Sequence, residues 1–95
     1  MLPIRQLPRE DFFFADGVTL SIRGLSRAEA IQTRSFGDDV IQIEVFCIAS
    51  AAGTTEDEAR AWHATTSQAE VEALVNAIIK LSGLNPDSGK VGAEN

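Results

Sequence analysis

The sequence predicts an α+β fold that is mainly α: a short N-terminal β-hairpin, about four short helices and a disordered C-terminal tail. Asp16-Gly17 lies between two apolar runs and indicates the hairpin, because this dipeptide tolerates the positive φ angles of a tight turn. Ser26–Glu29 (SRAE) and Ser67–Glu70 (SQAE) both match the capping box that opens a helix. After the second box, apolar residues recur at helical spacing from Val71 to Leu81, which predicts the clearest helix of the chain.

We expect one small domain, because 95 residues provide a single thin core. The domain is predicted to cover residues 1–84, with an irregular arm at 1–11, the hairpin at 12–24 and a helical part at 26–84. Residues 85–95 are polar and contain one Pro and two Gly, so they are predicted to be a disordered tail.

The arm is expected to be irregular because Pro3 and Pro8 lack the N–H groups needed for regular pairing. In the hairpin, apolar and polar residues alternate over 18–23, a period that places the apolar ones on one face. The opposing strand is expected to contain Phe12, Phe13 and Phe14, with at least one ring on the covered face and another in solvent.

The first helix is predicted from about residue 27 to 35, ending before Gly37. Residues 38–52 leave two alternatives. Their β-branched residues alternate as in a strand, whereas apolar residues from Ile41 to Ala52 also form a helical stripe. We predict a helix there, because Asp38-Asp39 can cap its start and Gly53 follows a plausible end.

The third helix is predicted over 56–63, with Thr54-Thr55 as its cap and an acidic first turn that complements the helix dipole. Ala59 and Trp62 are expected to face inward. The last helix is expected to supply the core and to end at Gly83, with Leu84 folding back in a Schellman motif.

Composition and charge exclude several classes of protein. The hydrophobic fraction of 44% excludes a wholly disordered chain, and the single cysteine forms no internal disulfide, which suits a reducing cytoplasm. No 18-residue apolar run and no apolar signal-peptide region are present, so neither a membrane span nor export is expected. The net charge is −6, and residues 35–95 carry ten acidic groups against three basic ones. This acidity argues against nucleic-acid binding and is compatible with a basic protein partner.

No catalytic residues, cofactor site or metal site are predicted. Cys47 and His63 are the one conceivable nucleophile–base pair, but Cys47 lies in an apolar run that is typical of a buried structural cysteine. His63 is expected to interact with the dipole at a helix end. The acidic runs 38–39 and 56–58 lack the ligand spacing of a calcium loop, and both fit the start of a helix.

Partner binding is the function that the aromatic residues favour. Three consecutive phenylalanines, Phe12–Phe14, are unusual in a soluble chain, and a lone tryptophan, Trp62, can act as an interface anchor. Core packing is the simpler explanation of each of them. With a mean hydropathy close to zero, a chain this short has little interior in which to bury every large apolar side chain. We therefore predict Phe12, Phe13, Phe14 and Trp62 as partner-binding residues, and we expect the chain to self-associate.

The order of these signals resembles a known family. Four segments follow one another between residues 17 and 84: a helix start LSRAE, an Ile/Val-rich segment VIQIEVFCIASA, an acidic helix TEDEARAW and a helix end IIKLSGL. Together they are similar to the tail assembly chaperones of long-tailed double-stranded DNA phages and prophages, of the siphophage type. Many such chaperones have a proline in the break between the last two helices, where this chain has Thr66 and Ser67.

The resemblance implies a non-enzymatic protein of the host cytoplasm. Such chaperones bind the long helical tape measure protein, keep it soluble, help to recruit tail tube protein, and are absent from the mature virion. It also implies a helix over residues 40–50. Many family members have a longer form made by ribosomal frameshifting, and Gly89-Lys90 can be encoded by a slippery sequence, although an ordinary flexible tail explains the dipeptide as well.

Two other classes of function remain open. One is a small acidic adaptor or antitoxin-like module that packs a helix face against a protein partner. The other is a small hydrolase or redox protein that uses Cys47.

Overall fold

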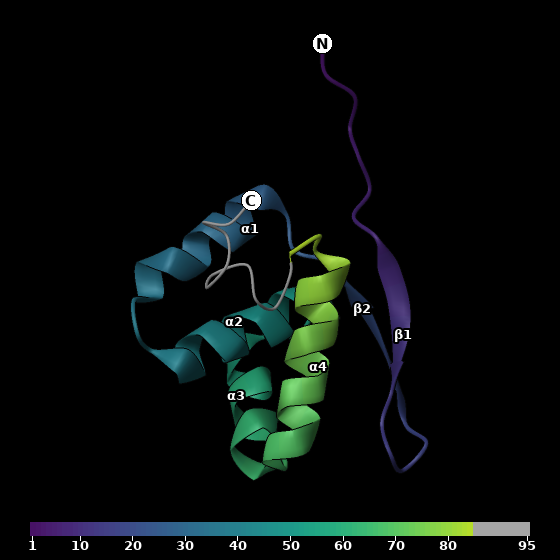
Figure 1. Cartoon of the computed structure of the whole chain (residues 1–95), viewed down its shortest axis with the longest axis vertical. Coiled ribbons are helices and arrows are strands. Elements are labelled where there is room, and N and C mark those ends of the chain that lie inside the picture. The colour runs from purple at the N-terminus through teal and green to yellow at the C-terminus, as the bar shows by residue number, and fades with distance from the viewer. Residues whose placement is uncertain (85–95) are drawn as a thin grey trace, which may run out of the picture.

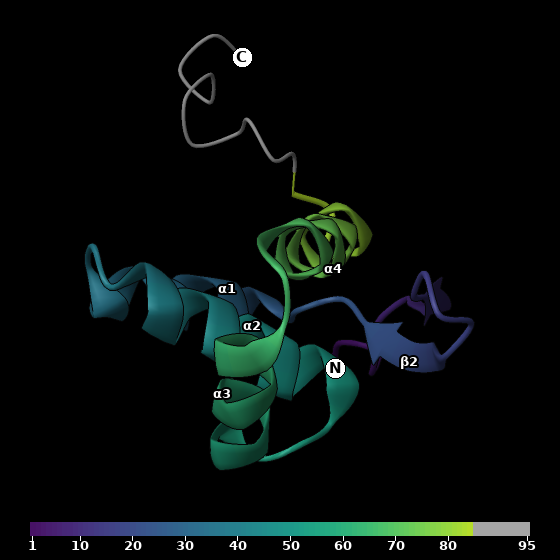
Figure 2. The ribbon, with the colours of Figure 1, turned by 90° about the horizontal axis from the view of Figure 1, so that it is seen from below.

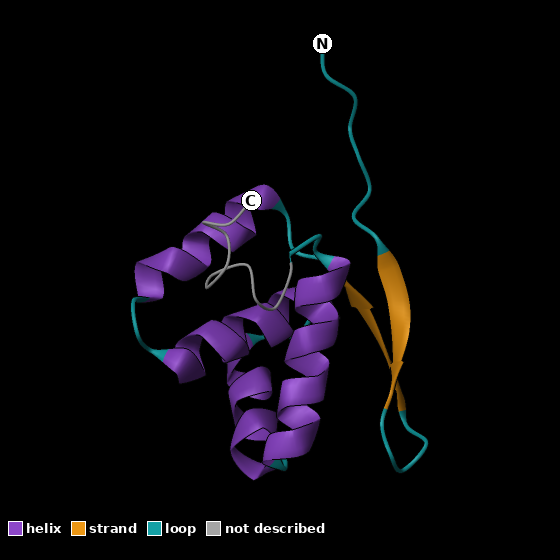
Figure 3. Ribbon diagram, in the orientation of Figure 1, coloured by secondary structure: helices purple, strands orange, loops and turns teal. Residues whose placement is uncertain are grey.

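The computed structural model describes residues 1–84, and it confirms the predicted fold class: an N-terminal hairpin followed by four α-helices (Figures 1 and 3). The predicted disordered tail, 85–95, lies outside the described residues. The elements in chain order are β1 (Arg9–Phe13), β2 (Thr19–Arg23), α1 (Arg27–Gln32), the 3₁₀ helix η1 (Thr33–Phe36), α2 (Val40–Ala52), α3 (Glu56–Thr65) and α4 (Gln68–Leu81).

The two strands pair antiparallel, with Phe12 opposite Leu20. The predicted arm, 1–11, is too long, because β1 begins at Arg9 and the Gly24 N–H donates to the Pro8 carbonyl at 2.8 Å. Proline cannot donate to a ladder, but its carbonyl still accepts, so pairing extends to Pro8. The structure therefore leaves residues 1–8 as the arm, which runs away from the helices (Figure 1).

The hairpin turn differs in detail from the prediction. Gly17 has a positive φ of 88°, whereas Asp16 does not. The Gly17 N–H donates to the Phe14 carbonyl, and the Asp16 side chain accepts from the Val18 N–H at 3.0 Å. Asp16 thus acts through its side chain, as aspartate commonly does in turns, and only glycine takes the left-handed position.

The capping box at Ser26 and Glu29 is confirmed, but α1 ends at Gln32 and continues as the 3₁₀ helix η1 instead of reaching residue 35 as α-helix. The Thr33 and Ser35 hydroxyls donate to the Ala30 and Gln32 carbonyls at 2.6 and 2.7 Å. Such back-bonding competes with regular helical hydrogen bonds, and this gives a physical reason for the early end.

Glu29 also joins the hairpin to the helices. Its carboxylate accepts two hydrogen bonds from the Arg23 guanidinium, at 2.8 and 2.9 Å, and one from the Ser26 N–H. The hydrogen bond from Arg23, strengthened by that from Ser26, outweighs desolvation and lowers the pKa of Glu29 to about 2. β2 and the start of α1 are therefore held together by a bidentate ion pair.

This pair predicts an acid-sensitive contribution to stability. A folded pKa of about 2 lies below the ordinary 4.5, so the stabilisation is present above pH 4.5 and is lost as the pH falls toward 2. We expect Glu29→Gln to lower the free energy of unfolding at neutral pH by roughly 1–3 kcal/mol, and to have a much smaller effect near pH 2. Urea unfolding of both proteins at several pH values measures this. An equal difference at every pH would contradict it.

The ambiguous segment is the helix α2, and it lies at the centre of the molecule. It packs against β2, η1, α3 and α4, so residues Val45–Ala49 are all buried. A helix that is covered on most sides needs apolar residues all round, and this explains why its sequence also looked like a strand. Asp39 caps it by accepting from the Gln42 N–H, and Gly53 ends it with a φ of 74°. Ile41, which the predicted stripe placed inward, is exposed.

The last two helices follow the prediction closely. α3 runs two residues further than expected, to Thr65, and Ser67 caps α4 by accepting from the Glu70 N–H at 3.3 Å. The predicted capping box at Ser67 is wrong in its second half, because within residues 1–84 the Glu70 side chain does not accept from the Ser67 N–H. Gly83 ends the helix with a positive φ of 81°. The N–H of the next residue, Leu84, donates to the Ile79 carbonyl at 3.0 Å, as a Schellman motif requires. Leu74 and Ile78 are almost fully buried, while Leu81 is half-buried. The stripe on α4 therefore contributes to the core, but α2 contributes more buried residues than α4, so the prediction that the last helix supplies the core holds only in part.

The hairpin is fixed against the C-terminal end of α4. A Cβ atom at Gly24 would lie 2.7 Å from the Leu81 carbonyl oxygen, so only glycine allows this approach. The Leu25 N–H donates to the Ser82 hydroxyl at 2.7 Å. As Figure 2 shows, the hairpin thus stands beside α4, on the side away from the N-terminal part of α2.

Candidate partner-binding site

The structure brings three of the four predicted partner-binding residues together. The ring centroids of Phe12 and Phe14 are 5.0 Å apart, and those of Phe14 and Trp62 are 5.9 Å apart. All three side chains are half-buried between the hairpin and the helices. Phe13 lies on the opposite face of the hairpin and is 70% exposed, because successive strand residues point to opposite faces.

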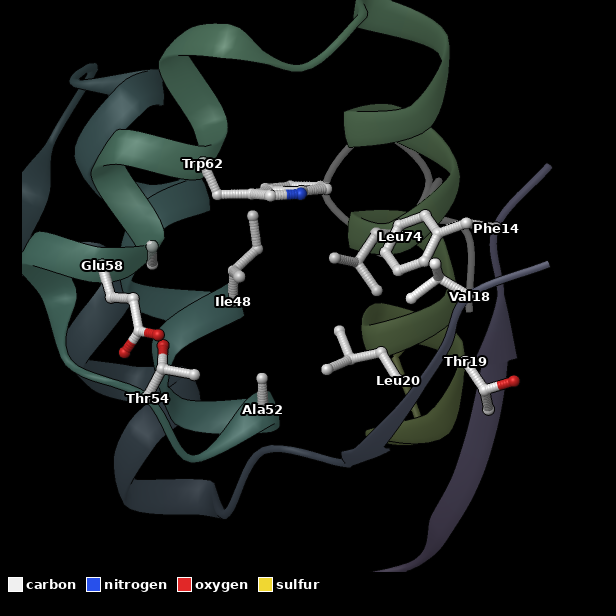
Figure 4. Close-up of a pocket in the computed structure, with 11 residues that line it drawn as sticks. Phe14, Val18, Thr19, Leu20, Ile48, Ala52, Thr54, Glu58, Trp62 and Leu74 are labelled. Carbon is white, nitrogen blue, oxygen red and sulfur yellow. The ribbon is translucent and has the colours of Figure 1, made fainter. Parts of the chain in front are cut away.

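Phe14 and Trp62 border a hollow of about 260 Å³ between the hairpin and helices α2, α3 and α4. Figure 4 shows the side chains of Trp62, Phe14 and Leu20 directed toward a common space. We call this space the apolar hollow, lined by Phe14, Val18, Thr19, Leu20, Ile48, Ala52, Thr54, Glu58, Ala59, Trp62 and Leu74. A dry cavity of about 150 Å³ can hold a benzene molecule. The apolar hollow is therefore large enough for a bulky apolar side chain.

The rim of the apolar hollow combines apolar exposure with negative charge. Val18 lies on the hairpin side and is exposed, although it is a large apolar residue. Glu58 lies on the α3 side, at the end of the acidic first turn that begins at Glu56. Thr55 holds this turn in place by accepting from the Glu58 N–H at 3.1 Å. An apolar group with a basic neighbour would match both properties.

A second depression, which sequence reasoning missed, lies on the other side of α4. We call it the α2–α4 groove; its volume is about 500 Å³, and it is lined by Val40, Ile43, Glu44, Glu72, Val75, Asn76 and Ile79. Four aliphatic side chains form it together with two carboxylates. Of this set, only Val75 belongs to a predicted helical stripe, and none of the α2 residues does, so only the packing of α2 against α4 shows that these residues are neighbours.

Cys47 and His63 do not have the features of a nucleophile and its base. Burial, assisted by the charges of Glu44 and Glu29, raises the pKa of the Cys47 thiol to about 11. A reactive cysteine needs the opposite shift, toward the thiolate. His63 instead lies with its Nε2 atom 2.7 Å from Glu44 Oε1, joining α3 to α2. His63 therefore lies in the last turn of α3, as expected, and also has a side-chain partner on α2.

Residues 1–84 offer neither a metal-ligand cluster nor a helix suited to span a membrane. No group of three or more His, Cys, Asp or Glu residues within this range is placed to hold a metal ion. None of the helices in the described part is both long and apolar enough to cross a membrane.

Comparison of the chain with protein-family models, with curated proteins and with solved structures finds no match.

Proposed function

We propose that the protein is a phage tail assembly chaperone that binds the tape measure protein through the apolar hollow and keeps it soluble. The observation that carries the proposal is the hollow itself, where half-buried Phe14 and Trp62 stand beside exposed Val18. The resemblance of residues 17–84 to such chaperones supplies the identity of the partner. On this proposal the protein acts in the host cytoplasm and is absent from the mature virion.

The shape and charge of the site suit a long helical target. Apolar contact is not directional, so one hollow can accept large side chains at many positions along a repetitive chain. The acidic first turn of α3 favours basic residues beside those side chains and repels other acidic surfaces. Phe13 extends the apolar surface to the outer face of the hairpin. Several copies are therefore expected on one tape measure protein, and tail tube protein is a further partner.

A small acidic adaptor or antitoxin-like module is the second candidate function. The same apolar hollow and acidic rim favour it, because they fit any basic amphipathic segment. The two functions differ in the partner that is bound, and this can be tested directly.

Trp62 provides the test, since it is the single tryptophan of the chain. We expect titration with tryptophan-free segments of the tape measure protein to shift the Trp62 emission to shorter wavelength, because the segment excludes water from the hollow. An equally long polar segment without large apolar residues is the control. Binding that leaves the emission unchanged would place the contact elsewhere, and absence of binding would contradict the proposed function.

A further inference from the structure

The N-terminal arm presents large apolar side chains directly to solvent. Leu2 is 88% exposed and Ile4 is 98% exposed. Pro3 fixes its own φ and biases Leu2 toward an extended conformation, so less conformational freedom remains to be lost on binding. Leu2 and Ile4 are therefore two exposed apolar side chains on either side of Pro3, and the cationic Arg5 follows them.

The α2–α4 groove has the complementary composition. Val40, Ile43, Val75 and Ile79 are aliphatic, and Glu44 and Glu72 add two carboxylates. His63 contacts Oε1 of Glu44, and Gln68 donates to Oε2 of Glu72. Within residues 1–84, no hydrogen bond uses the other oxygen of either carboxylate, so each can accept one from a guanidinium.

The hairpin that carries the arm and the groove of the same copy lie on opposite sides of α4. The hairpin, from which the arm leaves, stands on one side of this helix, and the N-terminal part of α2 lies on the other (Figures 1 and 2). The arm runs away from the helices, and its base is held by the hydrogen bond from the Gly24 N–H to Pro8. Docking within one copy would require the arm to reverse and cross α4, whereas a second copy can receive it without any such change.

We propose that the arm of one copy docks in the α2–α4 groove of a second copy, with Leu2 and Ile4 on the aliphatic residues and Arg5 beside Glu44 and Glu72. Each copy then offers one arm and one groove, and the apolar hollow on the other side of α4 stays open. This inference does not depend on the proposed function, because it concerns the chain alone. It explains how neighbouring copies can contact each other while each keeps its own partner site.

Sedimentation equilibrium of the purified chain tests the proposal. A contact made by two apolar side chains and one guanidinium is small, so we expect a Kd on the order of 0.1–1 mM. Deleting residues 2–7 is expected to leave a folded monomer over the same concentrations. A full-length chain that stays monomeric at about 1 mM would overturn the proposal, as would a deletion variant that associates as strongly as the full chain.

Two adjacent residues on α2 give a matched pair of variants. Val40 lines the groove and is 60% exposed, whereas Ile41 does not line it and is 51% exposed. Asp is tolerated in the first turn of a helix, so neither substitution should prevent folding. We expect Val40→Asp to weaken association at least about tenfold and Ile41→Asp to change it less than about twofold. Circular dichroism checks the fold of each, and equal effects would overturn the assignment to the groove.

A mixture of two defective variants gives the sharpest outcome. The arm-deleted chain keeps its groove, and Val40→Asp keeps its arm, so each alone should be monomeric while an equimolar mixture should associate. Charge reversal adds an independent check: Arg5→Glu and Glu72→Arg should each weaken association. Combining both in one chain should restore part of it, because Glu44 stays beside position 5. A mixture that stays monomeric, with both variants folded, would overturn the proposal. Loss of association in Val18→Asp alone would do the same, because it would assign the contact to the apolar hollow.

Discussion

Replacing Leu74 or Ile78 by alanine is expected to destabilise the protein by about 2–5 kcal/mol. Both side chains lie on α4 and are almost fully buried in the core cluster that joins the hairpin to the helices. Truncation removes buried apolar surface and leaves a cavity that the close-packed surroundings fill only in part. Because a small domain has a total stability of only about 5–15 kcal/mol, either variant should be largely unfolded under mildly denaturing conditions.

Urea unfolding followed by circular dichroism measures this effect, and Ile31→Ala is the control. Ile31 is also a large aliphatic residue in a helix, but it is exposed, so its truncation should change stability by less than about 0.5 kcal/mol. If Leu74→Ala and Ile31→Ala unfolded at the same urea concentration, the stripe on α4 would not form the core.

The elements that the sequence predicted well are those whose signals are local. The capping box at Ser26, the N-cap at Ser67, the glycine stop at Gly83 and the turn at Gly17 all depend on residues within one or two turns of each other. Such signals act through hydrogen bonds that a short segment makes with itself, so they can be read without knowledge of the fold. The helix–strand ambiguity of α2 arose because a helix that is buried from several sides has apolar residues all round, so its sequence lacks a clear amphipathic pattern.

The candidate site was predictable only in part, because its contacts join residues that lie far apart in the sequence. Phe14 and Trp62 were recognised as candidates by residue type, yet their contact depends on the way the hairpin packs against α3. Alternation in β1 separates Phe13 from its two neighbours, which a run of three identical residues does not reveal. The α2–α4 groove combines residues more than 30 positions apart, such as Ile43 and Val75, and no local signal marks it.

Co-expression with the tape measure protein is expected to produce a large rise in its soluble yield. This result follows from the proposed function, on which the long target exposes apolar surface that aggregates when unprotected, and copies of this protein cover that surface through their apolar hollows. Val18→Asp places a charge on the exposed rim of the hollow without disturbing the buried core, so it should abolish most of the rise. Phe13→Asp should reduce it as well. Phe14→Asp is a poorer test, because Phe14 is half-buried against Phe12 and Trp62 and its loss would also destabilise the fold.

The most direct measurement is the soluble fraction of the tape measure protein when it is co-expressed with the wild-type chain, with Val18→Asp or with Ile41→Asp. Ile41 is exposed and apolar like Val18, but it lies outside the hollow. The proposed function predicts a soluble target with the wild-type chain and with Ile41→Asp, and an insoluble target with Val18→Asp. A target that remains insoluble beside abundant, folded wild-type chain would contradict the proposed function.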